Sequence, residues 1–180
     1  MTDWDLPLGP FRDPLIARLF GYWNDRRAAR IGPARSDIDP IDFPWILADV
    51  TLVDVVVSDV AGAPVRFFTR VVGHAIVQRQ GFNMTGRWLE DFPEPQFRQI
   101  IARSYNSVVR ARVPRHGVRD IVLDGRRRRH EVIILPLSAD GERVDMLLAA
   151  LRDLPRSDLS GADRPPYGPI GVGPVGADPP

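Results

Sequence analysis

Strand-like and helix-like stretches are segregated along this chain, and their order restricts the fold more than any other feature. Two runs rich in β-branched residues come first, a helical region follows, and three further β-rich runs come last. Turn-forming residues separate the runs within each group, including two Asp-Gly dipeptides typical of hairpins. The predicted strands are residues 50–58, 65–72, 118–123, 127–137 and 144–151. Consecutive hairpins pair strands in antiparallel fashion, so we expect an α+β domain built on one antiparallel, five-stranded sheet.

An amphipathic helix is predicted near the N-terminus. Asp13 followed by Pro14 is typical of an N-cap and a first helical position, and apolar residues then recur at helical spacing until about Arg30. The apolar stripe includes Phe20 and Trp23, and it must cover either this domain's own core or a partner's helix. We favour the domain's own core, and we expect the helix to mediate a homodimer as well.

The region between the two groups of strands is predicted to be helical. Residues 94–109 carry one apolar face and therefore predict a second amphipathic helix. That face is formed by Phe97, Ile100, Ile101, Ser104 and Val108. The preceding segment, 73–89, is interrupted by three glycines and predicts short helices joined by turns.

Composition narrows the classes of function. The chain has no cysteine, which excludes disulfides, thiolate metal sites and a cysteine nucleophile. Its net charge of +1 provides no global field for nucleic acid or anionic membranes, and no stretch predicts a signal peptide or a membrane span. We therefore expect a cytoplasmic protein that binds neither nucleic acid nor membrane. Its predicted organisation is an N-terminal extension (1–12), one domain (13–152) and a disordered tail rich in Pro and Gly (153–180).

Several segments together resemble a bacterial family of stand-alone PAS-like domains, over most of residues 13–151. The matching segments are residues 36–44 (Ser-Asp-Ile-Asp-Pro-Ile-Asp-Phe-Pro), Arg70-Val-Val-Gly73, Thr85-Gly86-Arg87, Leu135-Pro-Leu-Ser138, Asp140-Gly141 and Met146-Leu147. Their order and spacing carry the resemblance. One departure is His74, because the family more often has a small hydroxyl residue after the glycine. The resemblance implies a PAS-like sheet with short helices on one face, and a role in sensing, ligand binding or dimerisation.

The candidate ligand site lies between the predicted sheet and the short helices, where PAS-like domains keep their pocket. His74 and Arg87 are the polar groups expected to orient a ligand. The apolar lining of the pocket is expected to be formed by Phe68, Val72, Ile76, Trp88 and Ile134. The alternative is that these residues simply fill the core of the domain. The alternative function is a ligand-free domain for protein interaction or dimerisation.

Other candidate chemistry is interpreted as structural. His116 and His130 form no spaced motif and are taken as ordinary histidines. The run from Arg126 to Arg129 is interpreted as a solvated hairpin end paired with nearby carboxylates. The acidic residues of the 36–44 segment are interpreted as turn and capping residues, so no metal site is expected.

No catalytic constellation is present, so the chain is not expected to be an enzyme. The identity of any cofactor stays open. Light-sensing flavin chemistry of the PAS type depends on a cysteine, which this chain lacks, and no motif favours a noncovalent flavin or haem.

Overall fold

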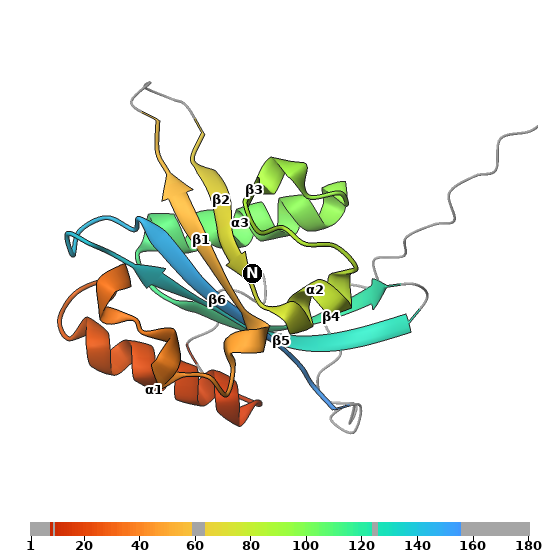
Figure 1. Ribbon diagram of the computed structural model, residues 1–180, viewed down its shortest axis with the longest axis horizontal. Coiled ribbons are helices and arrows are strands. Elements are labelled where there is room, and N and C mark those ends of the chain that lie inside the picture. Colours follow the sequence, from red (N-terminus) through yellow and green to blue (C-terminus); the bar gives the residue numbers. More distant parts are fainter. Residues whose placement is uncertain (1–7, 9, 59–63, 124–125, 156–180) are drawn as a thin grey trace, which may run out of the picture.

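The computed structural model describes residues 8, 10–58, 64–123 and 126–155, and the fold is one sheet covered on both faces (Figure 1). Helices and strands follow the order α1 (Pro14–Arg27), β1 (Val50–Val56), β2 (Arg66–Val72), α2 (His74–Gln80), β3 (Arg87–Trp88), α3 (Pro95–Ala111), β4 (Arg115–Leu123), β5 (Arg126–Leu137) and β6 (Met146–Asp153). Four single 3-10 turns join them: η1 (Arg35–Asp37), η2 (Pro40–Asp42), η3 (Leu47–Asp49) and η4 (Leu89–Asp91).

The sheet is antiparallel, in the order β3-β2-β1-β6-β5-β4, which confirms the predicted fold class. It has six strands where the sequence predicted five. The additional strand, β3, is two residues long and pairs with Phe68 and Thr69 of β2. Gly86 precedes it with a φ of 75°, a conformation that glycine adopts without strain. A strand of two residues is too short to produce a recognisable alternation, which is why the sequence did not reveal it.

Helix α1 covers one face of the sheet. Asp13 accepts hydrogen bonds from the backbone N–H groups of Leu15 and Ile16 at 2.7 and 3.3 Å, confirming it as the N-cap. The helix ends at Arg27, earlier than predicted, because Ala28 takes a positive φ of 51°. The cluster beneath it, hereafter the α1 layer, contains Ile16, Leu19, Trp23, Ile38, Phe43, Ile46, Val50, Ile133, Leu135, Leu137, Met146, Leu148 and Ala150.

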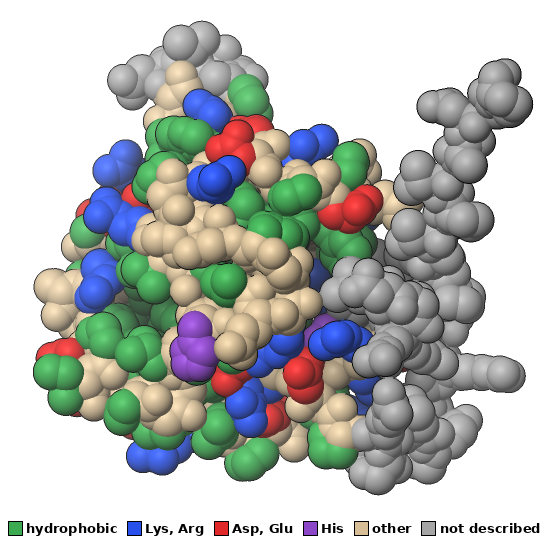
Figure 2. Space-filling view, turned by 45° about the vertical axis from the view of Figure 1, so that its right-hand side comes forward, with side chains coloured by type: hydrophobic (Ala, Val, Ile, Leu, Met, Phe, Trp, Pro, Cys, Tyr) green, Lys and Arg blue, Asp and Glu red, His purple; other side chains and the backbone are tan. Residues whose placement is uncertain are grey.

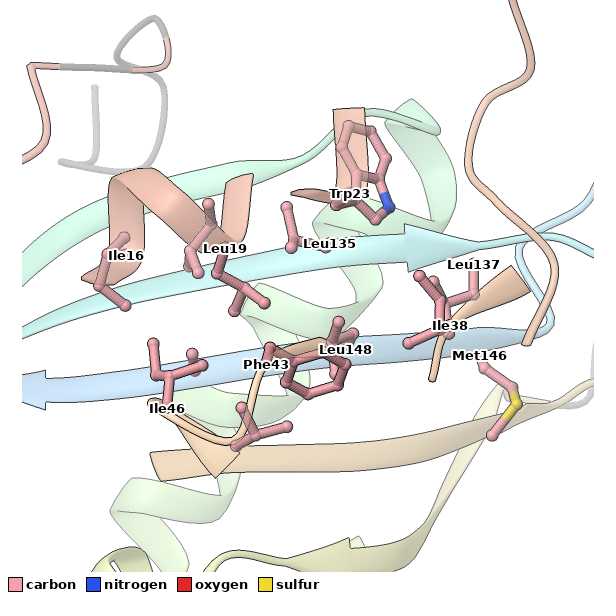
Figure 3. Close-up of a cluster of buried hydrophobic side chains, with 13 residues drawn as sticks. Ile16, Leu19, Trp23, Ile38, Phe43, Ile46, Leu135, Leu137, Met146 and Leu148 are labelled. Carbon is pink, nitrogen blue, oxygen red and sulfur yellow. The ribbon is translucent and has the colours of Figure 1, made fainter. Parts of the chain in front are cut away.

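Figure 3 shows the α1 side chains of this layer facing Leu135 and Leu148 of the sheet. Trp23 is buried and donates its indole N–H to the Pro136 carbonyl at 2.8 Å. Burying Trp23 and two aliphatic residues of α1 contributes roughly 5 to 9 kcal/mol as an upper estimate. That approaches the entire stability of a typical domain, about 5 to 15 kcal/mol, so α1 is an integral part of this fold.

Helices α2 and α3 and turn η4 cover the opposite face. The cluster on that side, hereafter the α3 layer, contains Val53, Val55, Phe67, Met84, Leu89, Phe92, Val108, Val132, Ile134, Val144, Leu147 and Ala149. Helix α3 carries the apolar face predicted for 94–109 and ends where Arg112 takes a left-handed conformation with a φ of 56°. The sheet therefore separates two apolar layers of similar composition.

The loops agree with the sequence where the structure describes them. Asp140 accepts backbone hydrogen bonds from Glu142 and Arg143, both at 2.8 Å, which hold its pKa well below the usual range. Gly141 has a φ of 80°, as this turn requires. The predicted turn at Asp124-Gly125, most of the first hairpin loop and nearly all of the predicted tail lie outside the described residues.

None of the helices in the described part of the chain combines the length and apolarity needed to cross a membrane.

Candidate functional site

The sheet divides the residues predicted to line a pocket. Phe67 lies in the α3 layer, and successive strand residues point to opposite faces, so Phe68 lies on the α1 side. There its ring meets Trp88 edge-on at 5.2 Å, and the Arg66 guanidinium lies 3.9 Å from the centre of the Trp88 ring. Phe68 and Trp88 therefore form an aromatic pair at the β2–β3 edge, on the side away from α3.

The remaining predicted residues lie in and around the α3 layer. Ile134 is buried within it and Val72 packs against it. Ile76 is half-buried on α2, while His74, the first residue of that helix, is exposed. Arg87 is exposed on β3. The structure thus brings Val72 and Ile134 into one layer and places the two predicted polar groups on the surface.

Three polar residues that sequence reasoning did not propose for the site lie between α3 and the sheet. Arg119 of β4 donates to the hydroxyl of Ser104 at 2.6 Å, and Ser104 donates to the Ile100 carbonyl at 2.8 Å. Burial lowers the pKa of Arg119 to about 10, and it raises the pKa of Tyr105 to about 12. The available signal was Ser104, a hydroxyl residue within the otherwise apolar face of α3.

The start of helix α2 is fixed where two backbones nearly touch. Gly73 precedes the helix, and its N–H donates to the Val50 carbonyl at 2.8 Å. A Cβ at this position would fall on the carbonyl of Ala48 in η3, so only glycine allows the approach. The contact places the start of α2 close to η3, whose last residue is Asp49.

Asp49 binds two arginines from opposite sides of the domain. It is almost fully buried, and its Oδ1 accepts from Arg79 of α2 while its Oδ2 accepts from Arg152 of β6 at 2.7 Å. Arg152 also donates to Asp13, the N-cap of α1, at 3.0 Å. Arg79, Asp49, Arg152 and Asp13 therefore form a continuous chain of ion pairs, hereafter the ionic chain, from α2 around the sheet to α1.

Both ends of the ionic chain are held by further charged contacts. On the α2 side, Asp153 pairs with Arg79 at 3.1 Å and with His130 at 2.6 Å. On the α1 side, the backbone N–H of Asp13 donates to Glu131 at 2.5 Å, and Glu131 also contacts His116 at 2.5 Å. Figure 2 shows basic and acidic side chains lying next to one another, beside a histidine, in the lower part of that view.

The environments of His116 and His130 differ from those of surface histidines. His130 is buried, and desolvation lowers its pKa despite the opposing effect of Asp153. His116 is buried against Glu131, and the ring of Phe11 packs edge-on to it at 4.7 Å. Both histidines thus contact carboxylates within the fold, Glu131 for His116 and Asp153 for His130, consistent with their interpretation as structural residues.

The arginine run at the β4–β5 hairpin is described in part. Arg129 lies 3.9 Å from Asp120, in agreement with the prediction that the run is neutralised by neighbouring carboxylates. Glu131, one of the nearby carboxylates expected to pair with the run because it follows Arg129 by two residues, instead lies fully buried against His116 and the start of α1.

The acidic residues of the 36–44 segment make the structural contacts expected of them. Asp39 accepts from the Ile41 N–H at 3.0 Å and caps η2. Asp42 pairs with Arg26 at 2.7 Å. Across the described ranges, no cluster of three or more acidic, histidine or cysteine side chains is arranged to hold a metal.

Comparison with known proteins gives a family match. Residues 12–152 match the family model described as "PAS domain". No curated protein matches the chain.

Solved structures that resemble the chain include further domains of this kind. The PAS domain of Bordetella pertussis BvgS is 17% identical, with a TM-score of 0.49, over 68% of this chain and 92% of that one. A PAS domain from Colwellia psychrerythraea is 16% identical, with a TM-score of 0.41, over 64% and 98%. A LOV protein of Rhodobacter sphaeroides is 18% identical, with a TM-score of 0.39, over 68% and 72%.

Proposed function

The chain belongs to the PAS domain family, and we propose that it is a sensory or regulatory domain in which a small ligand bound on the α3 side biases α1 on the other side. Domains of this family are generally sensory or signalling modules, and we propose no catalytic role for the chain. The observation that carries the proposal is the ionic chain, because it joins the two covering layers around the end of the sheet.

The ligand is proposed to enter the layer beneath α2 and α3. Val72 and Ile134 supply apolar surface there, while Ser104, Arg119 and Tyr105 supply polar groups that are rare in such a layer. An apolar lining with a few converging polar groups is the usual make-up of a small-molecule site.

Helix α2 is the proposed moving wall. Its seven residues have little internal hydrogen bonding to keep them rigid, and Gly81 ends the helix in a left-handed conformation. A displacement of α2 moves Arg79, which shares Asp49 with Arg152. Arg152 then binds Asp49 less and Asp13 more, or the reverse, and this change strengthens or weakens the N-cap of α1.

A ligand screen tests the sensory part of this proposal. Metabolites, flavins and haem would be screened by thermal shift, and the purified protein would be examined by native mass spectrometry for bound small molecules. We expect a ligand whose stabilisation is reduced in Ser104→Ala and unchanged in His74→Ala, since His74 is exposed. A hit that depends on His74 alone would move the site to the surface of α2. If neither measurement finds a ligand, the interaction role described below replaces the sensory one.

Hydrogen exchange tests the coupling. Arg79→Gln should speed exchange of the Leu15 and Ile16 amides, which Asp13 caps, while Arg98→Gln on α3 should leave them unchanged. Equal exchange in the two variants would refute transmission through the ionic chain.

A second function, homodimerisation, is favoured by apolar surface left uncovered by α1. Val56 and Val71 are 39% and 50% exposed, and they lie with Phe68 and Trp88 on the α1-side face of β1, β2 and β3. The larger α1 residues are buried in their own domain, which leaves half-buried Phe20 as the helix's main contribution to a dimer. We expect sedimentation of wild type to give a dimer at roughly tens of micromolar. Phe20→Glu and Phe68→Glu would then identify whether α1 or the sheet edge carries it.

A further inference from the structure

An open hollow of about 560 Å³ lies between the second half of α3 and the start of β4. It is lined by Arg103, Asn106, Ser107, Arg110, Ala111 and Arg115. Half of these residues are arginines and none is acidic, although the whole chain is nearly neutral. The hollow is therefore a local concentration of positive charge in a protein whose other charges are largely balanced.

The two helix arginines of this hollow are not neutralised by carboxylates. Several arginines elsewhere do pair with carboxylates, as Arg26 does with Asp42 and Arg30 with Asp37. The side chains of Arg103 and Arg110 make no ion pair or hydrogen bond with any other residue that the structure describes. The positive charge of Arg103 also acts on Arg119 beneath the helix, where it adds to the effect of burial in lowering the pKa of Arg119.

The sequence of α3 produces this field. Its 17 residues include no acidic residue, so no carboxylate one turn away offsets Arg103 or Arg110. Asn106 also lines the hollow, and it donates one of its two amide hydrogens to the Ala102 carbonyl at 2.8 Å, which leaves the other as a further donor. Asn106 thus adds a neutral donor between the two arginines of the helix.

We propose that this hollow binds a compact phosphate-bearing anion, such as an oligophosphate or a multiply phosphorylated small molecule. Its lining includes arginines from two separate elements, Arg103 and Arg110 of α3 and Arg115 of β4. A tetrahedral phosphate presents oxygens in several directions and can accept from all of them, whereas a planar carboxylate presents two oxygens in one plane. The lining contains no aromatic ring on which a nucleobase would stack, so the phosphate groups rather than a base carry the recognition.

Calorimetric titration of the full chain with inorganic tripolyphosphate tests this site. We expect saturable one-to-one binding at roughly 0.1 M salt, where long-range attraction is largely screened. The double variant Arg103→Gln/Arg110→Gln should weaken binding about tenfold or more, as the loss of charged hydrogen bonds predicts. The matched control is Arg98→Gln on the same helix, whose side chain instead donates to the Glu90 carbonyl at 2.9 Å and whose loss should change affinity little.

Several results would overturn the proposal. If tripolyphosphate does not bind, there is no site in the hollow. If the affinity falls by the same factor for each positive charge removed, in Arg98→Gln as in the double variant, the attraction is general and not specific to the hollow. Citrate that binds as tightly as tripolyphosphate through the same arginines would show that the anion is not selected for phosphate. Thermal melts of each variant confirm that its fold is retained, because both arginines of the double variant are exposed and their replacement removes no core contact.

Discussion

Replacing Asp49 by asparagine should destabilise the domain far more than removing a surface carboxylate. The substitution preserves the shape of the side chain and removes the negative charge that Arg79 and Arg152 share. Asp49 is 4% exposed, so the charges it balances are poorly solvated. The new asparagine side chain would also present an amide N–H₂ toward one of the two guanidinium groups, in place of an acceptor.

The size of the effect follows from the partners that remain. Breaking a fully buried ion pair by removing one member costs about 3 to 5 kcal/mol. Here the two arginine side chains are 16% and 30% exposed, and each keeps a second carboxylate, Asp153 for Arg79 and Asp13 for Arg152. We therefore expect Asp49→Asn to lower the free energy of unfolding by about 2 to 4 kcal/mol.

Urea denaturation at neutral pH measures this loss directly. Asp37→Asn is the matched control, because Asp37 also pairs with an arginine but is well exposed, and its loss should have little effect. A double-mutant cycle between Asp49→Asn and Arg79→Gln should give a coupling free energy of about 1 to 3 kcal/mol. A loss below about 1 kcal/mol for Asp49→Asn, or additive effects in the cycle, would refute the claim that Asp49 couples α2 to the sheet.

Three further predictions concern pH, backbone packing and the C-terminal segment. Because burial lowers the pKa of His130, the unfolded chain binds a proton at this residue at a higher pH than the folded protein does, so the stability that His130 provides is fully present above its unfolded pKa of about 6.5 and is lost as the pH falls toward the folded pKa. The melting temperature should therefore fall less between pH values of about 7.5 and 5.5 in His130→Gln than in wild type. An equal fall in the two proteins, or a larger effect from His74→Gln, would contradict this. Gly73→Ala should lower the melting temperature sharply or prevent folding, since its Cβ meets the Ala48 carbonyl, and a melting temperature near wild type would show that η3 can move aside. Truncation after Asp163 should leave the melting temperature nearly unchanged because the Pro- and Gly-rich sequence has little to pack; a loss of several degrees would show that this segment docks on the domain.

The fold could be predicted from sequence wherever the signal is local. Asp13-Pro14 specified the start of α1, and the β-rich runs with their Asp-Gly turns specified the strands and their antiparallel pairing. The faces of β2 could not be assigned in this way. Phe67 and Phe68 are consecutive and identical in type, so the pattern does not say which one enters the α3 layer.

The candidate site was less accessible to sequence reasoning because its contacts are distant along the chain. Arg79 and Arg152 lie 30 and 103 positions from Asp49, and Arg152 lies 139 positions from Asp13. No spacing rule connects charges so far apart, and a lone aspartate before a strand is usually a turn residue. The arginine hollow is different, since its helix members follow from the helical period of α3 and only the contribution of β4 required the fold.

The contact between Asp13 and Arg152 also brings together the places where the chain enters and leaves the domain. Asp13 directly precedes α1, and Arg152 lies one residue before the end of β6, yet their side chains meet at 3.0 Å. A short peptide could therefore join the two ends without disturbing any strand pairing, and the fold would tolerate circular permutation with new ends opened in an exposed loop. In a longer polypeptide, segments attached before α1 and after β6 would emerge from the same corner. Tension applied between them would load the contacts of Asp13 with Arg152 and Glu131 together with the last pairs of β6 with β5.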